Sequence, residues 1–198
     1  QMRKALWVAG GSVVFVLACA STQASKKVEA EPALPQESPT APVAEVSPAA
    51  QVADLKYVDD ENGFEIERPN PEWSFRSGEE LSTESIAVPL VVANGEKGAQ
   101  VVVQVAPAVA TPAQFAERLT EGLTSRAGFE TSEIKPIPLA EGAVGFDFDV
   151  GEQVHGRVAI LEGAEGRVYV LLATWPQSAP GEVEREVDQI LGSMKAHK

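Results

Sequence analysis

One histidine and two acidic residues on neighbouring predicted strands are the side chains that could carry out catalytic or metal chemistry. His155 lies in one predicted strand, and Asp147 and Asp149 alternate with phenylalanines in the strand before it. Adjacent strands could bring His155 together with Asp147 or Asp149, as in a metal site or the histidine–carboxylate part of a hydrolytic site. The sequence contains no nucleophile elbow, HExxH segment, phosphate loop or dinucleotide fingerprint. We therefore expect no enzymatic activity, cofactor or metal ion, with His155 exposed or structural.

The only thiol, that of Cys19, cannot form an internal disulfide. It follows the basic stretch Met2-Arg3-Lys4 and 14 uncharged, mostly apolar residues from Ala5 to Ala18. This length and these flanks are typical of a secretory signal. As a helix the apolar run would span only about 21 Å, whereas the hydrocarbon core of a membrane is about 30 Å thick.

The segment Val16-Leu17-Ala18-Cys19 resembles the lipobox of bacterial lipoprotein signal peptides. The resemblance implies that residues 1–18 are a signal peptide removed by cleavage, and that the Cys19 thiol is alkylated with diacylglycerol. Each buried methylene contributes about 0.8 kcal/mol, so two or three acyl chains anchor stably. An uncleaved transmembrane anchor and an ordinary secreted protein are the alternatives. In lipoproteins Ala20, rather than aspartate, favours the outer membrane, facing the periplasm, if the host is diderm.

Residues 20–54 have the composition of a spacer. They are rich in Ala, Pro, Glu, Ser and Val and contain no aromatic residue. Such a segment cannot bury enough surface to offset its chain entropy, so we expect a disordered tether that its prolines extend. A proline-rich recognition motif is the alternative. The predicted organisation is a signal peptide (1–18), the lipidated cysteine with its tether (19–54) and one globular domain (55–198).

The charge of the chain limits its partners. A formal net charge of −13 argues against nucleic acid, which requires clustered Lys and Arg, and against docking on anionic lipid head groups. We expect a membrane partner through the lipid anchor alone and a protein partner in the cell envelope.

The pattern of residues 55–198 predicts strands in hairpins with two amphipathic helices. Asn62-Gly63 between two alternating runs indicates a hairpin turn. Thr111-Pro112 and Gln114 predict a capped helix over 112–126, and Ser178 is a candidate cap for the terminal helix. The predicted strands are 55–58, 64–68, 86–92, 100–106, 129–135, 143–150, 154–161 and 167–175. Without βαβ alternation, this order predicts an α+β fold, a mainly antiparallel sheet packed with helices.

The terminal helix and two tryptophans offer further candidate surfaces. The apolar stripe of the helix is Val183, Val187, Ile190, Leu191 and Met194. Its acidic residues Glu182, Glu184, Glu186 and Asp188 are expected to be solvated, although such a face could bind a basic partner. We expect Trp73 and Trp175 to pack in the core or its rim, with a ligand groove as the alternative.

The segment Gly63-Phe64-Glu65-Ile66-Glu67-Arg68-Pro69, leading to Trp73, resembles the opening of the PsbP-like superfamily. The later order of a Val-rich strand, a helix, Phe-rich strands and a terminal helix agrees. The resemblance implies an α/β/α sandwich. This family includes extrinsic photosystem subunits, a Ran-binding nuclear protein and bacterial lipoproteins, so it favours a non-catalytic accessory role.

Two classes of function remain open. The first is an accessory, protein-interaction or assembly domain of an envelope lipoprotein. The second is a small-ligand carrier with a pocket between sheet and helices. A continuous apolar cavity favours the carrier, whereas a filled core with an exposed apolar patch favours partner binding.

Overall fold

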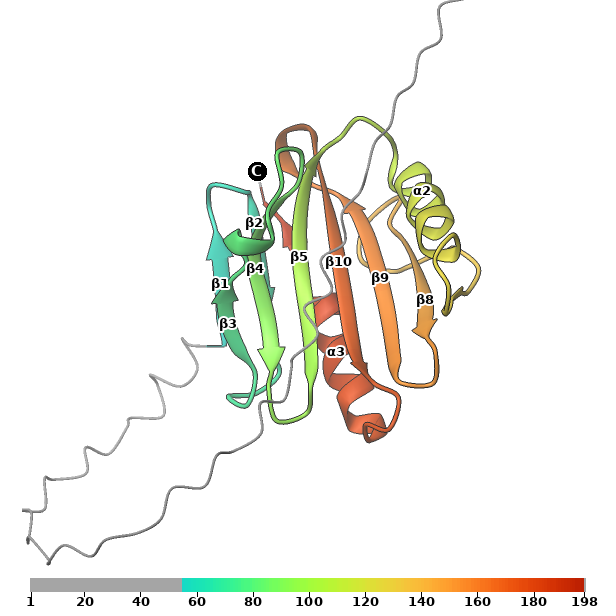
Figure 1. Cartoon of the computed structure of the whole chain (residues 1–198). Helices are drawn as coiled ribbons and strands as arrows, with labels where there is room; N and C mark the ends of the chain where they lie inside the picture. Colours follow the sequence, from blue (N-terminus) through green and yellow to red (C-terminus); the bar gives the residue numbers. More distant parts are fainter. Residues whose placement is uncertain (1–54, 198) are drawn as a thin grey trace, which may run out of the picture. The chain divides into compact units, whose positions relative to one another are not determined.

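The computed structural model describes residues 55–197 (Figure 1). The expected signal peptide, Cys19 and the tether lie outside these residues. Among the described residues, no helix has both the length and the apolar character needed to cross a membrane.

One antiparallel sheet of eight strands forms most of the described domain. Six strands run in the order β3-β4-β5-β10-β9-β8, after which β6 and β7 both pair with β8. The valine-rich sequence of β5 explains its central place, because valine favours the pleated backbone and both faces of this strand are buried. The bounds are β3 (Ser74–Ser77), β4 (Ala87–Asn94), β5 (Ala99–Pro107), β6 (Phe129–Thr131), β7 (Lys135–Pro136), β8 (Val144–Val150), β9 (Val154–Glu162) and β10 (Arg167–Pro176).

A second, three-stranded sheet joins the two ends of the described domain. Its strands are β1 (Lys56–Asp59), β2 (Phe64–Glu67) and β11 (Lys195–Ala196), with β2 in the middle. The predicted hairpin at Asn62-Gly63 is confirmed. Gly63 has a φ of +71°, and the Asp59 carboxylate accepts hydrogen bonds from the Asn62 backbone N–H at 2.8 Å and from its Nδ2 at 2.9 Å.

Helix α2 (Pro112–Thr124) begins as the sequence predicts. The Thr111 hydroxyl accepts from the Gln114 N–H at 3.3 Å, and the Gln114 side chain accepts from the Thr111 N–H at 3.1 Å. This capping box pairs two N–H groups that the first turn of a helix otherwise leaves without partners. The helix ends two residues before the predicted boundary at residue 126.

Helix α3 (Gly181–Ser193) begins later than the sequence predicts. Pro180 is its N-cap residue, with no side-chain capping bond, so the expected cap by Ser178 is wrong. The reason is a turn after β10, in which the Ala179 N–H donates to the Pro176 carbonyl and separates Ser178 from the helix.

The strands of the structure differ from the predicted ones in three places. The predicted strand over 129–135 is divided into β6 and β7, because the Ser132 hydroxyl accepts from the Asp147 N–H at 2.9 Å and takes a place in the ladder. The short strands β3 and β11 were not predicted, and neither were two 3₁₀ segments of three residues each. These segments are η1 (Glu79–Leu81) and η2 (Ala164–Gly166).

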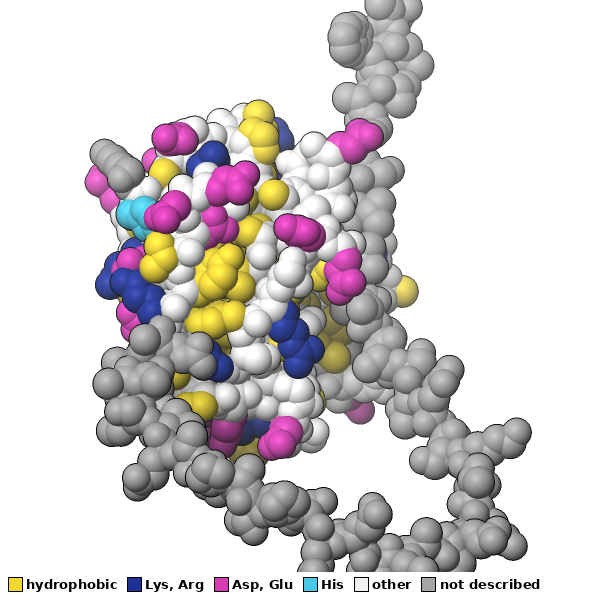
Figure 2. Space-filling model, turned by 90° about the vertical axis from the view of Figure 1, so that its left-hand side faces the viewer, with side chains coloured by type: hydrophobic (Ala, Val, Ile, Leu, Met, Phe, Trp, Pro, Cys, Tyr) yellow, Lys and Arg dark blue, Asp and Glu magenta, His cyan; other side chains and the backbone are white. Residues whose placement is uncertain are grey.

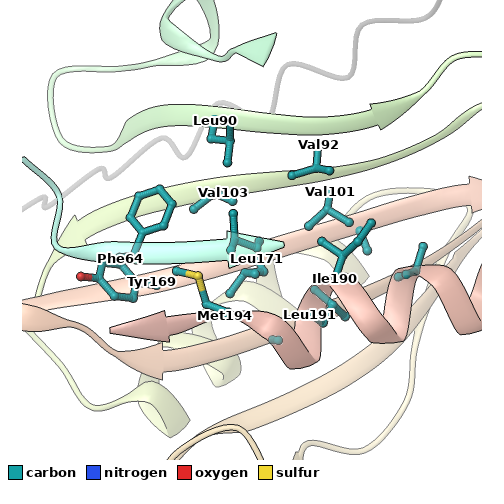
Figure 3. Packing of buried hydrophobic residues seen from close by; sticks show 14 of the residues in the cluster. Phe64, Leu90, Val92, Val101, Val103, Tyr169, Leu171, Ile190, Leu191 and Met194 are labelled. Atoms are coloured by element: carbon teal, nitrogen blue, oxygen red, sulfur yellow. The ribbon is translucent and has the colours of Figure 1, made fainter. Parts of the chain in front are cut away.

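The two helices cover opposite faces of the large sheet, because alternate residues of each strand face opposite sides. On one face, α3 packs on β5 and β10 beside β2 (Figure 3). On the other face, α2 packs on β8 and β9. The predicted α+β fold with a helix–sheet–helix layering is therefore confirmed. The labelled residues of the α3 side are Phe64, Leu90, Val92, Val101, Val103, Tyr169, Leu171, Ile190, Leu191 and Met194.

The side of the domain that carries β1 and β3 is mixed in character (Figure 2). Hydrophobic side chains gather in the middle of this face, and both acidic and basic side chains lie around them. Tyr57 of β1 and Phe75 of β3 are only partly buried, with ring centroids 5.6 Å apart. The two sheets therefore meet through aromatic packing at this edge.

Candidate functional site

The register of β8 and β9 brings His155 beside one of its two predicted partners. Asp149 lies directly opposite His155, and its Oδ1 is 2.5 Å from the histidine Nδ1. Asp147 lies opposite Arg157 instead, and its Oδ1 accepts from the Arg157 Nε at 2.7 Å. Of the two alternatives that the sequence left open, the structure therefore places Asp149 beside His155, because a two-residue step along β8 moves Asp147 to the next cross-strand pair.

Strand β10 and the residue after it complete the surroundings of His155. Trp175 lies opposite His155 in the sheet, with ring centroids 4.9 Å apart in an edge-on arrangement. The Gln177 Nε2 donates to the same Asp149 oxygen at 3.2 Å. Trp175 is only 5% exposed and belongs to the buried cluster under α3, so the core interpretation of this tryptophan is confirmed.

Arg157 of β9 pairs with three carboxylates, one on the neighbouring strand β8 and two on α3. Its Nε bonds to Asp147, its Nη2 donates to Glu184 at 3.1 Å, and its Nη1 donates to Asp188. The guanidinium carbon also lies 5.8 Å from the centroid of the Trp175 ring. Burial lowers the pKa of Arg157, but the hydrogen bonds that it donates to Asp147 and Asp188 outweigh this effect and hold the pKa above its ordinary value. Arg157 therefore stays charged and fixes α3 on β9.

Glu186 is a buried carboxylate that the sequence interpretation placed in solvent. It is 6% exposed, and its oxygens accept from the Trp73 Nε1 at 3.0 Å and the Asn70 Nδ2 at 2.7 Å. The Lys97 Nζ lies 3.0 and 3.1 Å from its two oxygens. Burial raises the pKa of Glu186, but the hydrogen bonds from Trp73, Lys97 and Asn70 prevail, so the pKa lies below its ordinary value.

Lys97 lies in the turn between β4 and β5, and two carboxylates hold its side chain. Its Nζ lies 2.9 Å from an oxygen of Glu72 and 3.0 Å from one of Glu186. Hydrogen bonds to Glu72 and Glu186 raise the pKa of Lys97. This turn between β4 and β5 is therefore tied to the start of β3 and to α3.

The expectation that the acidic residues of the terminal helix are solvated is confirmed for Glu182, Glu184 and Asp188, which are exposed, and is wrong for Glu186, which is buried. Glu184 and Asp188 pair with Arg157, and Glu186 pairs with Lys97. The spacing of the helix contained a signal for Glu186, because it follows Val183 by three residues and precedes Ile190 by four, which places it on the apolar stripe. A carboxylate there must find hydrogen-bond donors.

The cluster around His155 and Arg157 supplies fixed charge and hydrogen bonds. Within residues 55–197, no group of three or more His, Cys, Asp or Glu is arranged to hold a metal ion. His197, the second histidine, donates its backbone N–H to the Gly63 carbonyl at 3.0 Å, at the end of the small sheet. Cys19 lies outside the described residues.

The described domain has a PsbP-like α+β fold. Among solved structures, the cyanobacterial PsbP (CyanoP) of Synechocystis sp. PCC 6803 superposes with a TM-score of 0.51 at 15% sequence identity, over 72% of this chain and 91% of that chain. The Ran-binding protein Mog1p of Saccharomyces cerevisiae gives a TM-score of 0.47 at 11% identity, over 71% and 94%. No protein-family model and no curated protein matches the sequence. At such identities the likeness to CyanoP establishes the fold and not the activity.

Proposed function

We propose that this protein is an envelope lipoprotein, held on the membrane by acyl chains on Cys19 after removal of residues 1–18. The segment Val16–Cys19 supports the anchor, and Ala20 supports placement in the outer membrane, facing the periplasm, if the host is diderm. Residues 20–54 then serve as the tether. The formal net charge of −13, which becomes −15 when Arg3 and Lys4 leave with the signal peptide, keeps the protein in solution and repels it from anionic lipid.

The domain at the end of this tether acts as a non-catalytic accessory module that binds a protein of the envelope. The observation that carries this proposal is the internal use of its reactive side chains. Asp149 is shared by His155 and Gln177, and all three donor nitrogens of Arg157 are bonded to carboxylates. These groups therefore serve the architecture rather than a substrate.

The packing under α3 supports partner binding over a small-ligand carrier. A carrier would need a cavity of roughly 300–1,000 Å³. Side chains of the sheet and of α3 meet in one buried cluster (Figure 3). Ile190 and Leu171 are both fully buried there.

The lipid anchor is tested by the substitution Cys19→Ala in the full-length chain. We expect the wild-type protein to enter the detergent phase of a membrane extraction and the variant to enter the aqueous phase, because the acyl chains supply the membrane affinity. The matched control is Ala20→Ser, which leaves the thiol in place and should behave as wild type. Unchanged partitioning of Cys19→Ala would rule out the lipid anchor.

The partner is tested by chemical cross-linking in intact cells, followed by affinity capture and mass spectrometry. The control carries residues 1–54 fused to an unrelated soluble domain, so that it shares the location but lacks the PsbP-like fold. We expect one envelope protein to be captured reproducibly by the native chain alone. Capture of the same proteins by both chains would contradict the proposal, and a small molecule retained in native mass spectrometry would support the carrier instead.

A further inference from the structure

We draw no further inference here: the strongest candidate, the apolar strip of Val91, Ala93 and Val102 on the face of β4 and β5 opposite α3, packs with the neighbouring Leu81 and Leu172, and nothing else among residues 55–197 shows what covers it.

Discussion

At the scale of single residues, the hydrogen-bond partners of His155 and Asp149 indicate a structural role for this pair. A histidine that acts as a general base needs an unprotonated ring nitrogen and a reacting group within reach, and a histidine–carboxylate pair alone supplies neither a nucleophile nor a substrate. His155 has Asp149 on one side and the Trp175 ring on another, and Asp149 is itself shared with Gln177. The pair therefore fixes the ends of β8, β9 and β10 to one another.

The same sheet contains a residue whose small size is required. A Cβ at Gly156 would overlap the ring of Phe148, which lies across from it on β8. We expect Gly156→Ala to lower the free energy of unfolding by about 1–3 kcal/mol, because the buried ring must move out of a packed cluster. Chemical denaturation measures this change.

The matched control for Gly156→Ala is Gly122→Ala in α2, where nothing lies within 4 Å of the added carbon. Alanine favours a helix interior by about 1 kcal/mol over glycine, so this variant should be slightly more stable than wild type. Equal stabilities for Gly156→Ala and wild type would mean that Phe148 does not occupy the space above Gly156.

At the scale of elements, α3 is held on both flanks as well as beneath. Glu186 reaches the turn between β4 and β5 through Lys97, and Glu184 and Asp188 reach β9 through Arg157. Val183 and Val187 are fully buried between these two sets of ion pairs. Charge pairs therefore hold both flanks of α3, while its orientation and its attachment to the sheet come from burial of its apolar stripe.

Glu186→Gln tests the buried flank of α3. The variant keeps the shape of the side chain but removes the charge that Trp73, Asn70 and Lys97 share, so we expect a loss of about 1–3 kcal/mol of unfolding free energy near neutral pH. The pKa of Glu186 in the folded protein lies below its ordinary value of 4.5. Its stabilising contribution is thus complete above pH 4.5 and is lost as the pH falls through the lowered pKa.

The difference in stability between wild type and Glu186→Gln should therefore be largest near pH 7 and should shrink in denaturation curves recorded below pH 4.5. Glu182→Gln is the matched control on the same helix, because Glu182 is exposed; it should change stability by no more than about 0.5 kcal/mol. A difference for Glu186→Gln that stays constant from pH 7 to pH 3 would contradict an ionised carboxylate at this position.

Local signals in the sequence predicted the elements that local contacts define. The Asn62-Gly63 turn and the Thr111–Gln114 capping box each depend on residues a few positions apart, and both are present. Strand β11 has only two residues and β3 has one apolar residue, Phe75, so neither shows an alternating pattern, and both exist through distant partners in β2 and β4. For the candidate site, alternation placed Asp147 and Asp149 on one face of their strand, but only the strand register could pair Asp149 with His155 and Asp147 with Arg157.

At the scale of the whole described domain, residues 55–197 combine two sheets, of which the smaller is made from both ends of this range. Tyr169 of β10 couples the two, since its hydroxyl lies 2.7 Å from the Asn62 carbonyl and accepts from the Ala164 N–H at 3.2 Å. A domain of this size buries enough apolar surface to fold without a disulfide or a metal.

We expect residues 55–198, expressed alone, to unfold in one cooperative thermal transition. Its midpoint should equal that of residues 20–198, because a spacer adds no packing to the domain. Differential scanning calorimetry of both chains measures this. A lower midpoint for the shorter chain would place part of the folding unit before residue 55, and a broad transition without cooperativity would contradict the domain boundary.

The position of β1 has a mechanical consequence for a chain held from its N-terminal side. Any tension transmitted through residue 54 acts first on β1, which is an edge strand paired only with β2 through four residue pairs. On its other edge β2 is secured by β11, and Arg68, just after β2, donates its backbone N–H to the Leu55 carbonyl at 2.9 Å. A pulling force would therefore separate β1 from β2 while the eight-stranded sheet stays intact. The pairing of β1 with β2 is thus the contact that we expect to break first.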